Sequence, residues 1–167
     1  HCDIATIGNN EGMTISHEAL QNLYTEANFK VICANVFDEK GQLPNHITSS
    51  YIKEIEESRI LFVAATAPFT PFYRALDWVV TDPLAAIKDE IEAHEGQFDV
   101  LIVMSHVGVF FDEKLCQEIP EIDVIFGSHT HHYFENGELN NGVLMAAAGK
   151  YGHFLGEVNL TIEHGRV

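Results

Sequence analysis

The segment from Val124 to His131 is the feature that most constrains the fold of this chain. It reads Val-Ile-Phe-Gly-Ser-His-Thr-His, so an apolar strand delivers two imidazoles, His129 and His131, to the loop at its carboxyl end. Neutral imidazole is a common metal ligand, and alternate residues of an extended segment point the same way. Taken alone, the pattern is equally compatible with a metal site and with a polar turn that carries exposed histidines.

Two further apolar segments end in the same manner. Val100–Met104 is followed by Ser105 and His106, and Asp3–Ile7 is followed by a glycine and the carboxamides Asn9 and Asn10. Ligands of open α/β sheets bind outside the carboxyl ends of the parallel strands. The sequence therefore predicts an α/β fold in which these strand ends converge on one shared metal site.

Three short blocks, taken in order, resemble those of a known family. Gly8–Glu11, Ser105–Gly108 and Gly127–His131 are similar to the Gly-Asn-His-Glu, Ser-His-x-Gly and Gly-His-Thr-His blocks of calcineurin-like metallophosphoesterases. The closest resemblance is to the bacterial branch of 5′-nucleotidases, 2′,3′-cyclic phosphodiesterases and UDP-sugar hydrolases. The connecting segments 34–36 and 147–158 also look like those of this branch, so the resemblance covers essentially the whole chain.

The resemblance implies the later part of a four-layer α/β/β/α sandwich with a mixed sheet. The family's Asp-x-His and Gly-Asp-x-x-Asp blocks, which supply most of the first metal's ligands and the bridging carboxylate, do not occur in these 167 residues. We therefore expect residues 1–167 to be a single, incomplete catalytic domain, a fragment that lacks the opening βαβ region and the substrate-specificity domain.

The resemblance also implies a role for each site residue. Asn9, His106 and His129 would bind the second metal and His131 the first, with two divalent ions (Mn, Zn, Fe or Co) in the full-length enzyme and one or none in this chain. Asn10 and His106 are the catalytic candidates. Asn10 stands where the family has histidine, and an amide cannot carry the proton that imidazole offers to a leaving oxygen.

The implied function is hydrolysis of phosphoesters in nucleotides or nucleotide derivatives, with a small nucleotide or nucleotide-sugar substrate and little activity in this chain alone. The alternative is a degenerate, non-catalytic domain that binds metal or nucleotide, or serves as an interaction module. An uncovered sheet face beside the first strand would favour self-association.

Composition limits the classes of partner that this chain can bind. The 25 acidic and 9 basic residues give a formal charge of -16, which disfavours nucleic acid and anionic membranes. No apolar run is long enough to cross a membrane. The cysteines Cys2, Cys33 and Cys116 are odd in number and widely spaced, which argues against a disulfide framework and favours the cytoplasm.

Local patterns predict the elements in chain order. Helices are expected over 16–27 with Ser16 as N-cap, over 83–94 after Asp82, and over 112–118. A hairpin is expected over 51–56 and 59–65, a loop over 37–50, and strands over 3–7, 31–35, 99–104, 123–126, 133–134, 143–147 and 154–162. The aromatic residues between 69 and 78 suggest a packed loop or a lid.

Overall fold

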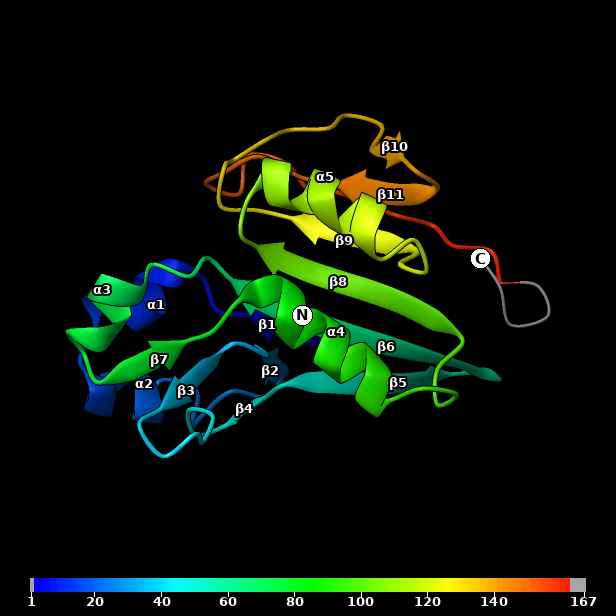
Figure 1. Cartoon of the computed structure of the whole chain (residues 1–167). Helices are drawn as coiled ribbons and strands as arrows, with labels where there is room; N and C mark the ends of the chain where they lie inside the picture. Colours follow the sequence, from blue (N-terminus) through cyan, green and yellow to red (C-terminus); the bar gives the residue numbers. More distant parts are fainter. Residues whose placement is uncertain (1, 163–167) are drawn as a thin grey trace.

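The computed structural model describes residues 2–162 and is built around a six-stranded mixed sheet (Figure 1). The strand order is β10-β11-β9-β8-β6-β5, with parallel pairing from β11 to β6 and an antiparallel strand at each edge. The strands are β5 Ser50–Ile55, β6 Ser58–Thr66, β8 Val100–His106, β9 Val124–Gly127, β10 Glu138–Asn140 and β11 Val143–Ala146. The predicted α/β fold with a mixed sheet and the predicted hairpin are confirmed.

A smaller parallel sheet lies beside the large one. It contains β1 Ile4–Thr6, β2 Lys30–Ile32 and β4 Ile47–Thr48 in the order β1-β2-β4. A two-stranded antiparallel pair, β3 Val36–Asp38 and β7 Trp78–Val80, completes this half of the molecule. The predicted loop over 37–50 is therefore wrong in part, because tertiary pairing makes strands of short segments that carry a weak local signal.

Helices α4 Pro83–Ala93 and α5 Val109–Glu118 cover one face of the large sheet (Figure 1). Their apolar residues, such as Ile87 and Leu115, are fully buried against the sheet. The Asp82 side chain accepts a hydrogen bond of 2.8 Å from the Ala85 amide, and proline occupies the first helical position. The predicted start of this helix is confirmed, because an N-cap acceptor followed by proline suits the first turn, whose backbone amides have no partner within the helix.

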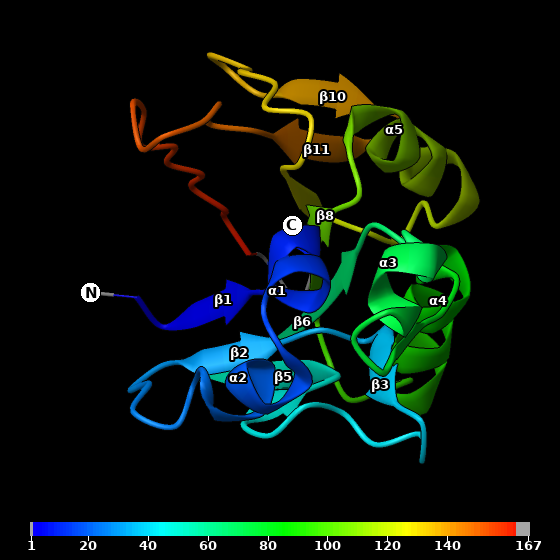
Figure 2. The same ribbon diagram turned by 90° about the vertical axis from the view of Figure 1, so that its left-hand side faces the viewer.

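The C-terminal segment covers the opposite face of the same sheet, as the second view shows (Figure 2). Its residues Val158, Leu160 and Ile162 pack against buried side chains that include Ile60 and Val124. The strand predicted over 154–162 is wrong: the segment forms no strand. The alternation of apolar residues reflects packing on a sheet face, which has the same period as strand pairing.

The first helical region is divided differently from the prediction. The structure has α1 Asn9–Thr14 and α2 His17–Asn22 in place of one helix over 16–27. Ser16 is the N-cap of α2 as predicted, and its Oγ accepts from the Ala19 amide. The helix ends early because the Asn22 side chain donates to a backbone carbonyl one turn back and the following residues form turns, a competition that asparagine often wins.

The segment that contains Pro68 and Pro71 includes a helix, α3 Thr70–Arg74. Tyr73 and Trp78 are fully buried, and a Cβ on Gly12 of α1 would overlap the Tyr73 ring. This contact joins α1 to α3. The interpretation as a packed segment is supported for Tyr73 and Trp78, whereas Phe72 remains 59% exposed.

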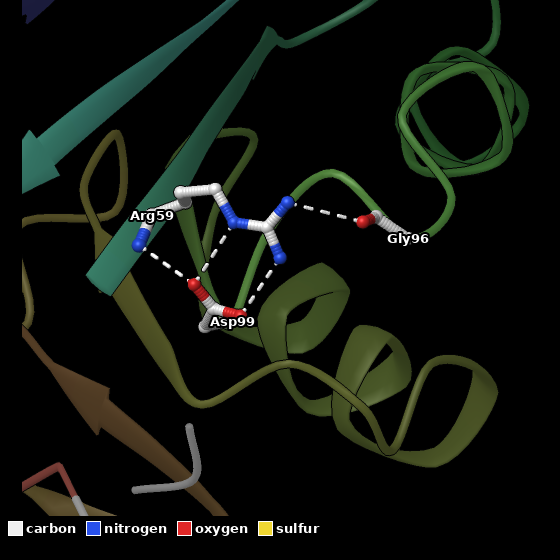
Figure 3. A network of polar contacts seen from close by, with 3 residues as sticks. All are labelled: Arg59, Gly96 and Asp99. Carbon is white, nitrogen blue, oxygen red and sulfur yellow. Dashed lines mark hydrogen bonds and ion pairs between the residues drawn. The ribbon is translucent and has the colours of Figure 1, made fainter. Parts of the chain in front are cut away.

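An ion-pair network ties the start of β6 to the loop before β8 (Figure 3). Both the amide and Nε of Arg59 donate to Asp99 Oδ2, at 2.8 and 3.1 Å, Nη2 donates to Oδ1 at 2.9 Å, and Nη1 donates to the Gly96 carbonyl at 3.1 Å. These hydrogen bonds from Arg59 lower the pKa of Asp99 to about 2. The network helps to fix the register in which Ile60 faces Val100.

Within residues 2–162, no helix is long and apolar enough to cross a membrane. Cys2, Cys33 and Cys116 are free thiols, and the last two are buried.

Candidate metal centre

The carboxyl ends of β1, β8 and β9 meet at one place. His106 is the last residue of β8, and Ser105 pairs with Gly127 at the end of β9. Asn9 begins α1 shortly after β1. The three strand ends therefore lie together in space, as predicted.

A carboxamide oxygen and two imidazoles face each other in this place. Asn9 Oδ1 lies 3.0 Å from His106 Nε2 and 2.9 Å from His129 Nδ1. Asn9 is 7% exposed. Within residues 2–162, no three His, Cys, Asp or Glu side chains form a metal-binding group. This cluster has only two such side chains, the imidazoles, and its third donor is an amide oxygen.

Burial keeps both imidazoles neutral. Burial first, and then charge repulsion from His129 and His131, lower the pKa of His106 to about 4. The pKa of His129 is also lowered, first by burial and then by His131. Neutral imidazole is the form that binds metal ions.

Ser128 orients His106, and the sequence reasoning missed this role. Its hydroxyl donates to the Ser105 carbonyl at 3.0 Å and lies 2.8 Å from His106 Nδ1. When the single hydroxyl proton is directed to the Ser105 carbonyl, His106 Nδ1–H is the donor in the second contact. His106 Nε2 then presents a lone pair toward Asn9 Oδ1.

In this tautomer, His106 Nε2 and Asn9 Oδ1 are two acceptors 3.0 Å apart, an arrangement that suits a shared cation. A neutral imidazole whose other nitrogen donates a hydrogen bond is the usual arrangement of a metal-binding histidine. Gly8 permits the close approach, because a Cβ there would lie 2.9 Å from His106 Nε2. The donor set thus fits a divalent ion of borderline softness.

In the part of the chain that the structure describes, neither His131 nor Asn10 forms a hydrogen bond to the imidazoles of this cluster. His129 and His131 have φ values of 69° and 58°, so their loop is not the extended segment that the sequence pattern predicted. His131 still lies near enough to lower the pKa of both His106 and His129 by charge repulsion. The His131 ring instead lies 6.4 Å from the Tyr151 ring. Asn10 is exposed and accepts a long hydrogen bond of 3.4 Å from Asn9.

Two further residues border the cluster. The Phe69 ring, from the segment before α3, lies 5.7 Å from the His129 ring and is 40% exposed. Thr130 Oγ1 accepts from the Val109 amide at 3.1 Å and so holds the histidine loop against the start of α5. The prolines on either side of Phe69 gave no signal of this proximity. Glu11 accepts a hydrogen bond of 2.8 Å from the Gly8 amide and so supports the loop before α1.

The proteins that this chain resembles in sequence include a metallophosphoesterase and several 5′-nucleotidases. The chain is 45% identical over 164 residues to the uncharacterized metallophosphoesterase YunD of Bacillus subtilis, covering 98% of this chain and 36% of that protein. It is 25% identical over 156 residues to the 5′-nucleotidase of Homo sapiens, covering 89% of this chain and 27% of that protein. No family profile matches the chain. The chain spans about a third or less of the length of these relatives.

Solved structures agree on the fold. The 5′-nucleotidase precursor from Thermus thermophilus superposes with a TM-score of 0.77 at 21% identity, covering 90% of this chain and 34% of that one. The calcineurin-like phosphoesterase YfkN from Bacillus subtilis gives 0.75 at 20% identity, covering 88% and 54%. The resemblance indicated by the sequence blocks is therefore confirmed, and the chain is a metallophosphoesterase homologue with the fold of the 5′-nucleotidases.

Proposed function

We propose that this chain supplies the imidazole and carboxamide part of a divalent-metal site in a phosphoester hydrolase that acts on nucleotides or nucleotide derivatives. The observation that carries the proposal is the approach of His106 Nε2 and His129 Nδ1 to within 3.0 Å of Asn9 Oδ1. Relatives named 5′-nucleotidase support the substrate class. The donor set suits Mn, Zn, Fe or Co better than Ca.

Each residue of the cluster has a distinct task in this proposal. Asn9, His106 and His129 would hold one ion and His131 the other. The ions would supply polarisation of the phosphoryl group and a water of lowered pKa. Ser128 fixes the ring of His106 through Nδ1, and Phe69 lies beside His129, where it would limit the entry of water.

Asn10 bears on which phosphoesters would react. Its side chain is exposed beside Asn9 and cannot donate an acidic proton to a departing oxygen. Substrates whose leaving groups are already stable anions, such as the diphosphate of a nucleotide sugar, would then react more readily than simple monoesters.

The metal site is tested by calorimetry with Zn²⁺ or Mn²⁺ on this chain. His129→Ala should weaken binding by at least about tenfold, since one of few ligands is lost. The matched control is His46→Asn, which removes an exposed imidazole at a positive-φ position and should leave metal binding unchanged. Equal metal affinity in His129→Ala and the parent chain would contradict the site.

A second candidate, a non-catalytic domain, is favoured by one observation. Residues 2–162 contain no group of three His, Cys, Asp or Glu side chains at metal-binding distance, so a carboxylate that could bridge two ions is not gathered at this cluster. We expect this chain alone to be nearly inactive and the complete natural protein to hydrolyse a nitrophenyl phosphodiester with Mn²⁺. A complete protein that binds metal without turnover would support the non-catalytic function.

A further inference from the structure

A tight turn of residues 149–153 follows β11 and lies next to the histidine loop. β11 pairs in parallel with β9, so both strands deliver their following loops to the same edge of the sheet. The Gly149 amide donates to the His132 carbonyl at 2.8 Å and ties the turn to the residue after His131. The turn is therefore held against the histidine loop by a backbone hydrogen bond.

Tyr151 is the centre of a small cluster on this turn. Its ring lies 6.4 Å from the ring of His131 and 5.9 Å from that of His153, and Lys150 Nζ lies 4.9 Å from its centroid. The Tyr151 side chain nevertheless remains 79% exposed. One aromatic ring thus connects a lysine ammonium to a candidate metal ligand and keeps an open side toward solvent.

The backbone of the turn is unusual for these residues. Tyr151 has φ 61°, between Gly149 and Gly152 with φ 74° and 65°. A bulky residue in the left-handed region is strained, and it persists where its surroundings require it. In this conformation the Tyr151 ring lies 6.4 Å from the His131 ring and 4.9 Å from Lys150 Nζ.

Lys150 forms no ion pair within the described part of the chain. Three other cations are neutralised by carboxylates, in the ion pairs Lys53–Asp3, Arg59–Asp99 and Lys88–Glu118. Within residues 2–162, Lys150 contacts a neutral ring and pairs with no carboxylate. A cation–π contact orients an ammonium group without cancelling its charge.

A further positive charge here would favour an anionic substrate. The chain has a formal charge of -16, which repels phosphate, and the imidazoles of the cluster are neutral ligands. We infer that Lys150, supported by the Tyr151 ring, binds an anionic oxygen of a phosphate group held beside His131. The inference rests on the proposed function, because it assigns a further residue to the substrate of that same site.

The test uses the complete natural protein loaded with metal and inorganic phosphate as the probe. Lys150→Gln should raise the dissociation constant of phosphate, measured by calorimetry, by about tenfold or more, because a charge-assisted hydrogen bond is lost. Lys150→Arg should restore most of the affinity. Metal affinity should be unchanged in both variants, and KM for a nucleoside monophosphate should rise more than kcat falls.

The matched control is Lys40→Gln. It removes the same charge from the exposed turn after β3, and both views place β3 far from β11 (Figures 1 and 2). Equal losses of phosphate affinity in Lys40→Gln and Lys150→Gln would show that the change in net charge alone explains the effect. That result would overturn the inference.

The outcomes separate this inference from the proposed function. Unchanged phosphate affinity in Lys150→Gln, or no phosphate binding by the parent protein, overturns the inference even if phosphoesters are hydrolysed. Phosphate binding that depends on Lys150 in a protein without hydrolytic activity would support the inference and contradict the hydrolase. Tyr151→Leu should weaken phosphate binding in the same direction, and an unchanged affinity there would count against the ring as support.

Discussion

Replacing Asp112 with asparagine should stabilise the protein above neutral pH more than it does in mild acid. Asp112 lies on α5 behind the candidate site, is 3% exposed, and its Oδ1 has no hydrogen-bond partner in the described part of the chain. A Cβ on Gly127 would lie 2.5 Å from its Oδ2. Burial raises the pKa of Asp112 from 3.8 to about 7, against a hydrogen bond from Ser105 that lowers it.

The sign of the effect follows from proton binding. Between the unfolded and folded pKa values, from 3.8 to about 7, the folded state binds more protons than the unfolded state, so this carboxyl lowers stability as pH rises. His106, with a pKa lowered to about 4, acts in the opposite direction below its ordinary pKa. The two contributions oppose each other in mild acid, and the Asp112→Asn substitution removes only one of them.

The magnitude can be worked from the same values. The stabilisation by Asp112→Asn should be about 2–3 kcal/mol larger at about pH 8 than at about pH 5. Any cost of an unpaired amide is common to both conditions and cancels from this difference. Urea unfolding with added chelator measures it. The control Asp89→Asn removes a charge from the exposed side of α4 and should change the free energy of unfolding little at either pH. An Asp112→Asn effect that is equal at both pH values would refute the reasoning.

Three further substitutions test other parts of the structure. Gly12→Ala should destabilise the chain by about 1–3 kcal/mol in urea, because its Cβ would overlap the buried Tyr73 ring; an unchanged midpoint would contradict that packing. Asp99→Asn should lose stability at neutral pH and converge with the parent near pH 2, since the Arg59 contacts that lower the pKa of Asp99 to about 2 stabilise only the ionised form; a constant difference across acid pH would argue against the ion pair. In the complete protein, Asn10→His should raise kcat/KM for nucleoside monophosphates by roughly 10²-fold and change anhydride hydrolysis little; an equal response of both substrates would remove Asn10 as the determinant.

The sequence allowed prediction of the elements whose signals are local. The helix after Asp82 begins where an N-cap and a proline require it, and the hairpin of β5 and β6 follows two runs of strand formers. Segments with short or mixed signals were predicted less well. Residues 154–162 alternate apolar side chains as a strand does, yet they are packed on a sheet face without pairing, and local periodicity cannot distinguish these cases.

The sequence by itself also determined which residues carry the candidate chemistry, because Asn9, His106 and His129 follow apolar strands at the positions where sheet ligands gather. It did not determine their orientation. Three features depend on parallel pairing between distant strands. They are the left-handed turn at His129 and His131, the contact of Ser128 with the His106 ring and the approach of Phe69 to His129. Tertiary structure alone decided them, because hydrogen bonds and ring contacts between residues far apart in the chain leave no periodic pattern in the sequence.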